Sequence, residues 1–271
     1  MSFDLARVSD TLRCHLTLEQ FNQISISFHL FPEQQGETPP TPNNPILYPD
    51  LVRRDNARRF FRALKRTMDI VGSVLALTIC APLFLVIAAA IKLTSKGPVF
   101  FRQTRVGQYG VPFVFLKFRS MYTDSDSDIH EGYVREFIAG KAERKPSNEN
   151  SEGVYKLTND PRVTRLGAFL RKTSLDELPQ FFNVFRGDMS LVGPRPPILY
   201  EVGAYDIWHR RRLLEAMPGI TGLWQVNGRS RLKFDEMVRL DLRYAQTWSP
   251  WLDVKILART PRAVLLGDGA Y

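Results

Sequence analysis

The longest apolar run in the chain, residues 70–91, reads IVGSVLALTICAPLFLVIAAAI and contains no charged side chain over its twenty-two residues. A helix of that length can cross a hydrocarbon core about 30 Å thick. A buried helix of a soluble protein is usually shorter and keeps a polar stripe along one side. The pattern therefore favours a helix that is inserted into a membrane.

Pro82 lies in the middle of this run, and basic residues stand on both sides of it. They are Arg53, Arg54, Arg58, Arg59, Arg62, Lys65 and Arg66 before the run, and Lys92, Lys96, Arg102 and Arg105 after it. Lys and Arg prefer the cytoplasmic side of a membrane, and proline removes a backbone donor and kinks a helix. We therefore predict that residues 58–96 form a basic segment and a re-entrant helix-break-helix. A simple span stays open, because transmembrane helices tolerate proline.

Residues 1–57 are predicted to form an N-terminal extension, to which we assign no function. Ile24, Ile26, Phe28 and Leu30 alternate as in a strand, and residues 31–50 form a proline-rich linker. The first residues, MSFDLARVSD, lack the apolar region of a secretory signal. Any membrane association must therefore come from another segment.

Behind the apolar run, two aromatic-rich stretches flank GQYG within residues 97–121, which is typical of a β-hairpin. Lys117 and Arg119 are two residues apart in the second stretch, so they should share one face of a strand. The segment at about residues 122–155 is largely polar and is predicted to be a surface insertion.

Three amphipathic helical patterns follow at residues 203–217, 234–248 and 250–266, each with a tryptophan and basic residues. Such helices lie in a membrane interface or pack onto a core. Together these patterns predict an α+β fold, as a mostly helical monotopic membrane protein with a re-entrant broken helix, interfacial amphipathic helices and a small β-hairpin. Residues 97–271 would form its cytosolic catalytic domain.

Charge narrows the choice of partner. The 37 Lys and Arg exceed the 28 Asp and Glu, and the net charge of +9 suits nucleic acid, lipid headgroups or a phosphorylated substrate. The two cysteines, Cys14 and Cys80, suggest neither a disulfide framework nor a zinc site, which indicates a reduced, cytosol-facing protein. No Walker loop, G-x-G-x-x-G or H-E-x-x-H motif is present, which disfavours those nucleotide-binding loops and histidine-based catalysis.

Two adjacent acids, Asp176 and Glu177, stand in TSLDELPQFFNVFRGDMSLVGPRP, residues 173–196. Ser174 and Glu177 fit a capping box, whereas Pro179 is better placed if Asp176 is the N-cap. Either alternative puts both acids at a helix N-terminus, which should keep Asp176 ionised. An ionised carboxylate there is a candidate nucleophile toward phosphorus and a candidate magnesium ligand.

Basic residues surround this pair in the sequence. They are Arg162, Arg165, Arg171, Lys172 and Arg186, with Arg195 held between prolines in GPRPP. Arginine in a rigid segment is suited to bidentate contact with phosphate. A basic hairpin, an acidic pair and a rigid arginine that follow a membrane segment suggest phosphoryl transfer at a membrane face.

The chain resembles the bacterial sugar transferases, the monotopic phosphoglycosyl transferases that move a sugar 1-phosphate from a UDP-sugar to a polyprenol phosphate. The resemblance covers the region from about Lys65 to Ile256. The strings that carry it are KRTMD, SKGPVFFRQTRVGQYGVPFVFLKFRSM, LTNDPRVTRLGAFLRKTSLDELPQFFNVFRGDMSLVGPRP, PGITGLWQVNGR and LDLRYAQTWSPWLDVKIL.

This resemblance implies that Asp176 attacks the β-phosphorus of the UDP-sugar, releases UMP and carries the sugar phosphate, with Mg²⁺ held at Asp176. Glu177 would act as base or orienting partner. The implied substrate-binding residues are Lys117, Arg171 and Arg195, and Arg119 is counted with them because it shares the predicted strand face of Lys117.

The resemblance also implies a re-entrant helix shaped by Arg66, Asp69 and Pro82, because the family breaks this helix at a proline thirteen residues after the aspartate of KR..D, as here. One departure is Ala81, where many members have serine. The chain would be a small, single-anchor type in the bacterial inner membrane, with its catalytic domain on the cytosolic face.

The implied partners are a UDP-sugar, undecaprenyl phosphate and inner-membrane lipids, with downstream glycosyltransferases as further candidates and no nucleic acid. Two alternatives stay open, a membrane-tethered nucleic-acid or lipid-binding module and an inactive scaffold of a polysaccharide assembly complex. The acidic pair argues against the binding module, because carboxylates that face an anionic ligand would repel it.

Overall fold

The computed structural model describes residues 59–122, 128–142, 145–147, 151–155 and 162–265. The strand and linker expected within residues 1–57 lie outside this part of the chain, so they stay predictions. The described residues combine many helices with three two-stranded sheets. This confirms the expectation of a mixed, mostly helical fold.

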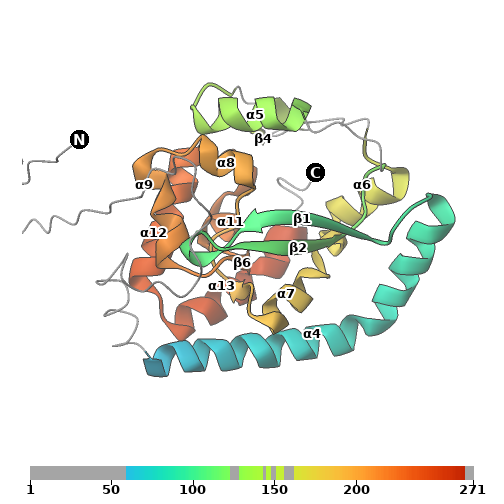
Figure 1. Ribbon diagram of the computed structural model, residues 1–271, viewed down its shortest axis with the longest axis horizontal. Coiled ribbons are helices and arrows are strands. Elements are labelled where there is room, and N and C mark those ends of the chain that lie inside the picture. The colour runs from blue at the N-terminus through green and yellow to red at the C-terminus, as the bar shows by residue number, and fades with distance from the viewer. Residues whose placement is uncertain (1–58, 123–127, 143–144, 148–150, 156–161, 266–271) are drawn as a thin grey trace, which may run out of the picture. The chain divides into compact units, whose positions relative to one another are not determined.

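Helix α4, Arg59–Thr94, contains the whole apolar run. It continues past Pro82 as one helix, and Figure 1 shows that this blue-green helix changes direction along its length. The predicted helix-break-helix is therefore a single bent helix here, because one missing N–H kinks the hydrogen-bonded ladder without ending it. Among the described residues, α4 is the one helix long and apolar enough to cross a membrane, and 11% of its most apolar window is buried.

Polar side chains fasten the N-terminal half of α4 to the rest of the domain. Arg66 donates at 2.7 Å to two carbonyl groups in the last turn of α7, Gln180–Arg186. Asp69 is buried and accepts hydrogen bonds at 2.9 Å from a hydroxyl and an N–H of strand β5, Ser190–Val192. The last carbonyls of a helix favour a cation, so Arg66 also completes the end of α7.

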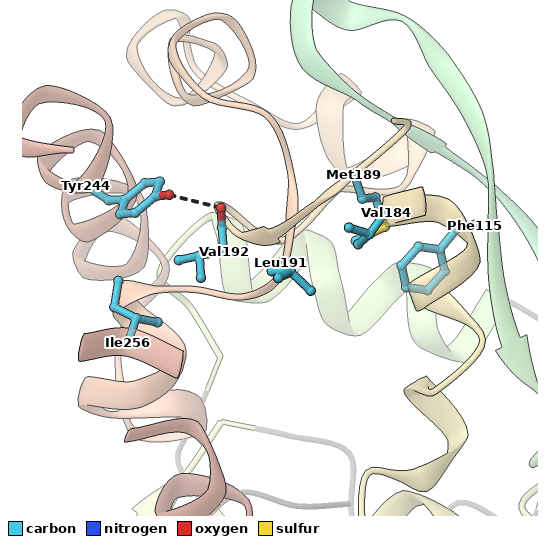
Figure 2. Packing of buried hydrophobic residues seen from close by; sticks show 7 residues of the cluster. All are labelled: Phe115, Val184, Met189, Leu191, Val192, Tyr244 and Ile256. Carbon is cyan, nitrogen blue, oxygen red and sulfur yellow. Dashed lines mark hydrogen bonds between the residues drawn. The ribbon is translucent and has the colours of Figure 1, made fainter. Parts of the chain in front are cut away.

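Strand β5 pairs in parallel with β6, Gly219–Thr221, beside the main hydrophobic core. In Figure 2 the hydroxyl of Tyr244 donates to the carbonyl of Val192 across this core, at 3.0 Å. Lys65 of α4 reaches the same place and donates to Tyr244 at 3.1 Å and to Asp253 at 2.7 Å. The buried residues of the cluster are Phe115, Val184, Met189, Leu191, Val192, Tyr244 and Ile256.

The predicted hairpin is confirmed. Strand β1, Phe100–Val106, pairs antiparallel with β2, Pro112–Phe118, around the short 3₁₀ turn η2, Gln108–Gly110. Tyr109 in that turn has a φ of 60°, the left-handed conformation that reverses the chain. Aromatic side chains of β2 then face the core, as Phe115 does in Figure 2.

Two of the three C-terminal patterns are confirmed as helices, α12 at Phe234–Thr247 and α13 at Pro250–Leu265. The expectation of one helix at residues 203–217 is wrong, because that region contains the end of α8, Leu199–Gly203, then α9, Ile207–Arg210, and α10, Arg212–Glu215. Asp206 caps α9 and takes an extended conformation there, so the chain turns instead of continuing a helix. Beyond β6 come α11, Leu223–Asn227, and the turn η4, Arg229–Arg231.

The described part of the 122–155 segment contains helix α5, Asp128–Ile138, and the antiparallel strands β3, Lys145–Ser147, and β4, Ser151–Val154. Figure 1 shows α5 lying next to α8. Ile138 is buried in a second cluster with Tyr205, Phe234 and Val238. The segment expected to be a polar surface insertion therefore also contributes to a core.

Candidate active site

The two acids lie on a tight 3₁₀ turn, η3, Leu175–Glu177, between α6, Arg165–Lys172, and α7. Ser174 is the N-cap of η3, as one of the two alternatives predicted, but the predicted capping box does not form, and Asp176 lies within η3 instead of at an N-cap. Ser174 has a φ of 56° and makes no capping hydrogen bond, and the N-cap of α7 is Pro179. Because Pro179 has no N–H, regular α-helical hydrogen bonding starts only behind it, and the acids stand on the preceding turn.

Lys117 of β2 joins the two acids. Its ammonium group lies 3.1 Å from Oδ2 of Asp176 and 2.8 Å from Oε1 of Glu177. Asp176 is only 4% exposed, whereas the side chain of Glu177 is 33% exposed. The lysine therefore bridges one buried and one accessible carboxylate that are adjacent in the sequence.

The surroundings move the pKa values of the two acids in opposite directions. Burial raises the pKa of Asp176, although the charges of Lys117 and Arg171 oppose the rise. Burial would also raise the pKa of Glu177, but the charges of Lys117, Arg195 and Arg105 outweigh it and lower that pKa. The positive charge of Lys117 therefore favours the ionised form of Asp176, in place of the helix N-terminus that we expected. Because the pKa of Asp176 is raised and that of Glu177 is lowered, Asp176 is the more basic of the two carboxylates and the better candidate nucleophile.

A small hollow beside the acids is lined by Glu177 and three basic side chains, Arg105, Lys117 and Arg195. Its remaining polar side chains are the amides of Gln180 and Gln225. Three cations around one acid give a site that favours a ligand with several negative charges, such as a diphosphate.

The main chain around Arg195 is held from two sides. Arg212 donates to the carbonyl of Arg195 at 2.9 Å, and Arg105 donates to the carbonyl of Pro196 at 3.0 Å. Arg212 in turn forms a buried ion pair with Asp241 at 2.8 Å, with side chains 5% and 1% exposed. The rigidity that the prolines suggested is therefore reinforced by contacts from distant segments.

The structure brings together most of the predicted site residues. Glu177, Lys117 and Arg195 line the hollow, Asp176 contacts Lys117, and Arg171 lowers the pKa of Asp176 from the end of α6. Arg119 does not join them, because its guanidinium donates to the carbonyl and hydroxyl oxygens of Ser95 at 2.8 and 2.7 Å. Ser95 is the residue that follows α4 in the sequence.

Three polar side chains of the hollow were not among the predicted site residues, namely Arg105, Gln180 and Gln225. Arg105 was noted only as a basic residue that follows the apolar run. The two glutamines carry no charge and belong to no motif that signals chemistry by itself, although the string PGITGLWQVNGR contains Gln225.

The chemistry of the donor set fits magnesium. Carboxylate oxygens are hard ligands, and Mg²⁺ is usually held by one or two carboxylates together with substrate phosphates. Asp176 and Glu177 are two carboxylates joined by one lysine, beside a hollow suited to phosphate. Within the part of the chain that the structure describes, no cluster of three or more metal-ligating side chains is present.

A buried carboxylate, a lysine that joins it to a second acid and a basic hollow fit a site for phosphoryl transfer. Residues 60–267 match the family described as Bacterial sugar transferase, and the chain belongs to this family.

Curated relatives include the galactosyl transferase CpsE of Streptococcus agalactiae, which is 44% identical over 76% of this chain and 43% of its own length. The undecaprenyl-phosphate galactose phosphotransferase of Salmonella typhimurium is 44% identical over 81% of this chain and 44% of its own length. The UDP-glucose:undecaprenyl-phosphate glucose-1-phosphate transferase of Caulobacter vibrioides is 42% identical over 76% of this chain and 72% of its own length. The chain thus spans less than half the length of the first two.

Proposed function

We propose that the chain transfers a sugar 1-phosphate from a UDP-sugar to undecaprenyl phosphate or a similar polyprenol phosphate, and releases UMP. The observation that carries this proposal is the contact of one lysine with both acids at the edge of a basic hollow. The names of the Salmonella and Caulobacter relatives support the choice of donor and acceptor.

In the first half-reaction a carboxylate oxygen of Asp176 forms a bond to the β-phosphorus of the UDP-sugar. The bond from that phosphorus to the bridging oxygen breaks, and UMP leaves with the bonding electrons. Lys117 and Arg195 bind the phosphate oxygens and balance the charge that builds up on them. The product on the protein is an acyl phosphate that carries the sugar.

In the second half-reaction an oxygen of the polyprenol phosphate attacks the same phosphorus, and the bond to Asp176 breaks. The carboxylate is regenerated and the sugar leaves on a polyprenol diphosphate. Glu177 is more exposed than Asp176 and lines the hollow, so it is placed to act as a base or orienting group for the incoming acceptor, and its lowered pKa keeps it ionised. Magnesium held by Asp176 and Glu177 would supply further charge neutralisation at the diphosphate.

We place α4 in the bacterial inner membrane as a re-entrant helix, with the catalytic domain on the cytosolic face. Basic residues at both ends of the apolar run and the bend of α4 support this topology. Tags at residues 1 and 271 should both be inaccessible from outside in spheroplasts until the inner membrane is opened. A tag at residue 1 that is accessible from outside would show a single span instead.

The product would serve as the first lipid-linked intermediate of an exopolysaccharide, capsule, O-antigen or glycoconjugate, and downstream glycosyltransferases would extend it. A nucleic-acid or lipid-binding module is a poorer fit, because a carboxylate with a lowered pKa lines the hollow. An inactive scaffold would have no need for a lysine that bridges two acids.

The proposal is tested with purified protein, Mg²⁺, polyprenol phosphate and a panel of UDP-sugars, with UMP release as the readout. Asp176→Asn should abolish UMP release and the covalent labelling of the protein by donor with a radioactive sugar. Glu136→Gln, on the exposed side of α5, is the matched control for the loss of one carboxylate and should behave as the wild type. Full activity of Asp176→Asn would exclude Asp176 as the nucleophile.

A further inference from the structure

Helix α7 carries apolar side chains on two sides. Phe181 and Val184 pack in the main hydrophobic core. Phe182 and Phe185 lie outside that core and are 39% and 48% exposed. A helix at the surface of a water-soluble domain normally keeps its outer side polar, so the outer side of α7 is suited to contact with hydrocarbon.

The two exposed phenylalanines continue an apolar stripe that starts beside the acids. Leu178 follows Glu177 directly and, like Pro179 after it, has a helical backbone conformation. Residues 178, 182 and 185 are therefore spaced as i, i+4 and i+7, which places them on one side of the helical segment. Leu178, Phe182 and Phe185 are called the α7 stripe below. The stripe runs from the turn that carries the acids to the last turn of α7.

The α7 stripe also contacts the apolar helix α4, which lies beside α7 in Figure 1. Leu178 packs against the buried cluster that contains Ile87 of α4. The ring of Phe182 meets the ring of Phe84 edge to face, with 5.9 Å between the centroids. Both α4 residues follow Pro82 within the apolar run. The stripe therefore joins the acids to the part of α4 that the proposed topology places in hydrocarbon.

The second half-reaction sets a requirement that this arrangement meets. The phosphate of the acceptor must reach the phosphorus held on Asp176, whereas its long isoprenoid chain is apolar and stays in hydrocarbon. The chain must then leave the acids along an apolar surface that is continuous with the membrane. A UDP-sugar is water-soluble and needs no such surface.

We infer that the α7 stripe binds the isoprenoid chain of the polyprenol phosphate next to its phosphate and so directs that phosphate to Asp176. This inference rests on the proposed function, because it takes the acceptor to be a polyprenol phosphate. It assigns a place to the acceptor chain, which the proposed reaction leaves open. Ordinary membrane lipids are the competing occupant, and they would cover Phe182 and Phe185 without selecting the acceptor.

The test uses the full chain in nanodiscs of phosphatidylethanolamine and phosphatidylglycerol and compares the wild type with Phe182→Ser/Phe185→Ser. KM for undecaprenyl phosphate should rise roughly 10- to 100-fold, because two apolar contacts with the acceptor are lost. KM for the UDP-sugar and the burst of covalent labelling by donor alone should change less than about twofold. The unchanged burst also shows that the variant is folded.

Two further variants separate the acceptor from ordinary lipid. Phe182→Leu/Phe185→Leu keeps the stripe apolar and should restore most of the lost affinity for undecaprenyl phosphate. Trp251→Ser removes a 63% exposed aromatic side chain from α13 and should leave KM for the acceptor unchanged. An equal rise of KM in Trp251→Ser would show general contact with lipid and overturn the inference. An unchanged KM in Phe182→Ser/Phe185→Ser would overturn it as well.

A binding measurement keeps the inference separate from the proposed function. A polyprenol phosphate with a photoreactive diazirine on its first isoprene unit is crosslinked to the wild type, and the labelled peptides are mapped by mass spectrometry. Labelling of α7 that excess undecaprenyl phosphate suppresses, and phosphatidic acid does not, supports the inference even if the wild type releases no UMP. Absence of UMP release would contradict the proposed function alone. Labelling confined to other segments, or no labelling, would overturn the inference.

Discussion

The buried ion pair between Arg212 and Asp241 should reduce stability while it supports activity. The perturbation is the double variant Arg212→Met/Asp241→Leu, which replaces both charges by apolar side chains of similar volume. Arg212 donates to the carbonyl of Arg195, so the variant also removes one of the contacts that hold this arginine at the hollow. Stability and activity are therefore expected to change in opposite directions.

The structure sets the magnitudes. Both side chains are at most 5% exposed, and neither oxygen of Asp241 has a hydrogen bond of regular geometry within the described residues. Burial raises the pKa of Asp241 to about 6 although a guanidinium lies 2.8 Å away, so desolvation exceeds the attraction for the carboxylate, whereas the charges of Asp241 and its neighbours outweigh burial for Arg212 and raise its pKa. Replacement of such a pair by apolar residues is expected to leave stability unchanged or raise it by about 1–4 kcal/mol, and the lost hydrogen bond to the carbonyl of Arg195 offsets part of any gain. For a domain of this size, that raises Tm by at most about 15 °C.

Activity should fall because a hydrogen bond from a charged donor is worth about 1.5–3 kcal/mol. Its loss at the carbonyl of Arg195 corresponds to a decrease in kcat/KM of about 10- to 100-fold. Since the effect acts through Arg195, Arg195→Ala should reduce kcat/KM much less in the double variant than in the wild type. Arg171→Ala should reduce kcat/KM by the same factor in both proteins.

The assays are thermal melts in one detergent at a fixed scan rate and UMP release at saturating acceptor. Arg212→Met alone is expected to be the least stable protein of the series, because it leaves Asp241 buried without its counter-charge. A double variant that melts well below the wild type would refute the argument from desolvation. If the double variant has wild-type activity, or if its loss of kcat/KM simply adds to that of Arg195→Ala, Arg212 does not position Arg195.

Three further expectations concern packing, anchoring and pH. Gly167→Ala should destabilise α6 and lower Tm, because a Cβ there would stand 1.9 Å from the carbonyl oxygen of Ser120, whereas Gly203→Ala meets no atom within 4 Å and should raise Tm slightly. Asp69→Ala removes the two hydrogen bonds to β5 and should cost about 2–4 kcal/mol in chemical denaturation, and a loss below about 0.5 kcal/mol would contradict this anchoring role. Because the pKa of Asp241 is raised to about 6 in the folded protein, its contribution to stability is present below about pH 4 and is lost as the pH rises through about 6. Over that interval the free energy of unfolding of the wild type should fall by on the order of 3 kcal/mol relative to the double variant. If the free energies of unfolding of the two proteins change in parallel with pH, this prediction is wrong.

Patterns that depend on near neighbours were predicted well. The apolar run, the hairpin around GQYG and the helices α12 and α13 follow from periodicities of 3.6 and 2 that a short window contains. The strands β5 and β6 were missed because each has three residues and its partner is distant in the sequence. The start of α7 was predicted too early, because Pro179 has no N–H and a separate 3₁₀ turn that begins after Ser174 precedes the helix.

For the site, the sequence alone supplied the acids Asp176 and Glu177 and the basic residues Lys117 and Arg195, because charged groups and prolines are visible without coordinates. Only the tertiary structure decided which of them meet. It placed Lys117 on both acids, turned Arg119 away to Ser95 and brought Arg105 to the same hollow as Lys117 and Arg195. The physical reason is that residue type fixes charge and donor capacity, whereas burial and the partners brought from distant segments fix the pKa values and which polar atoms stay unpaired.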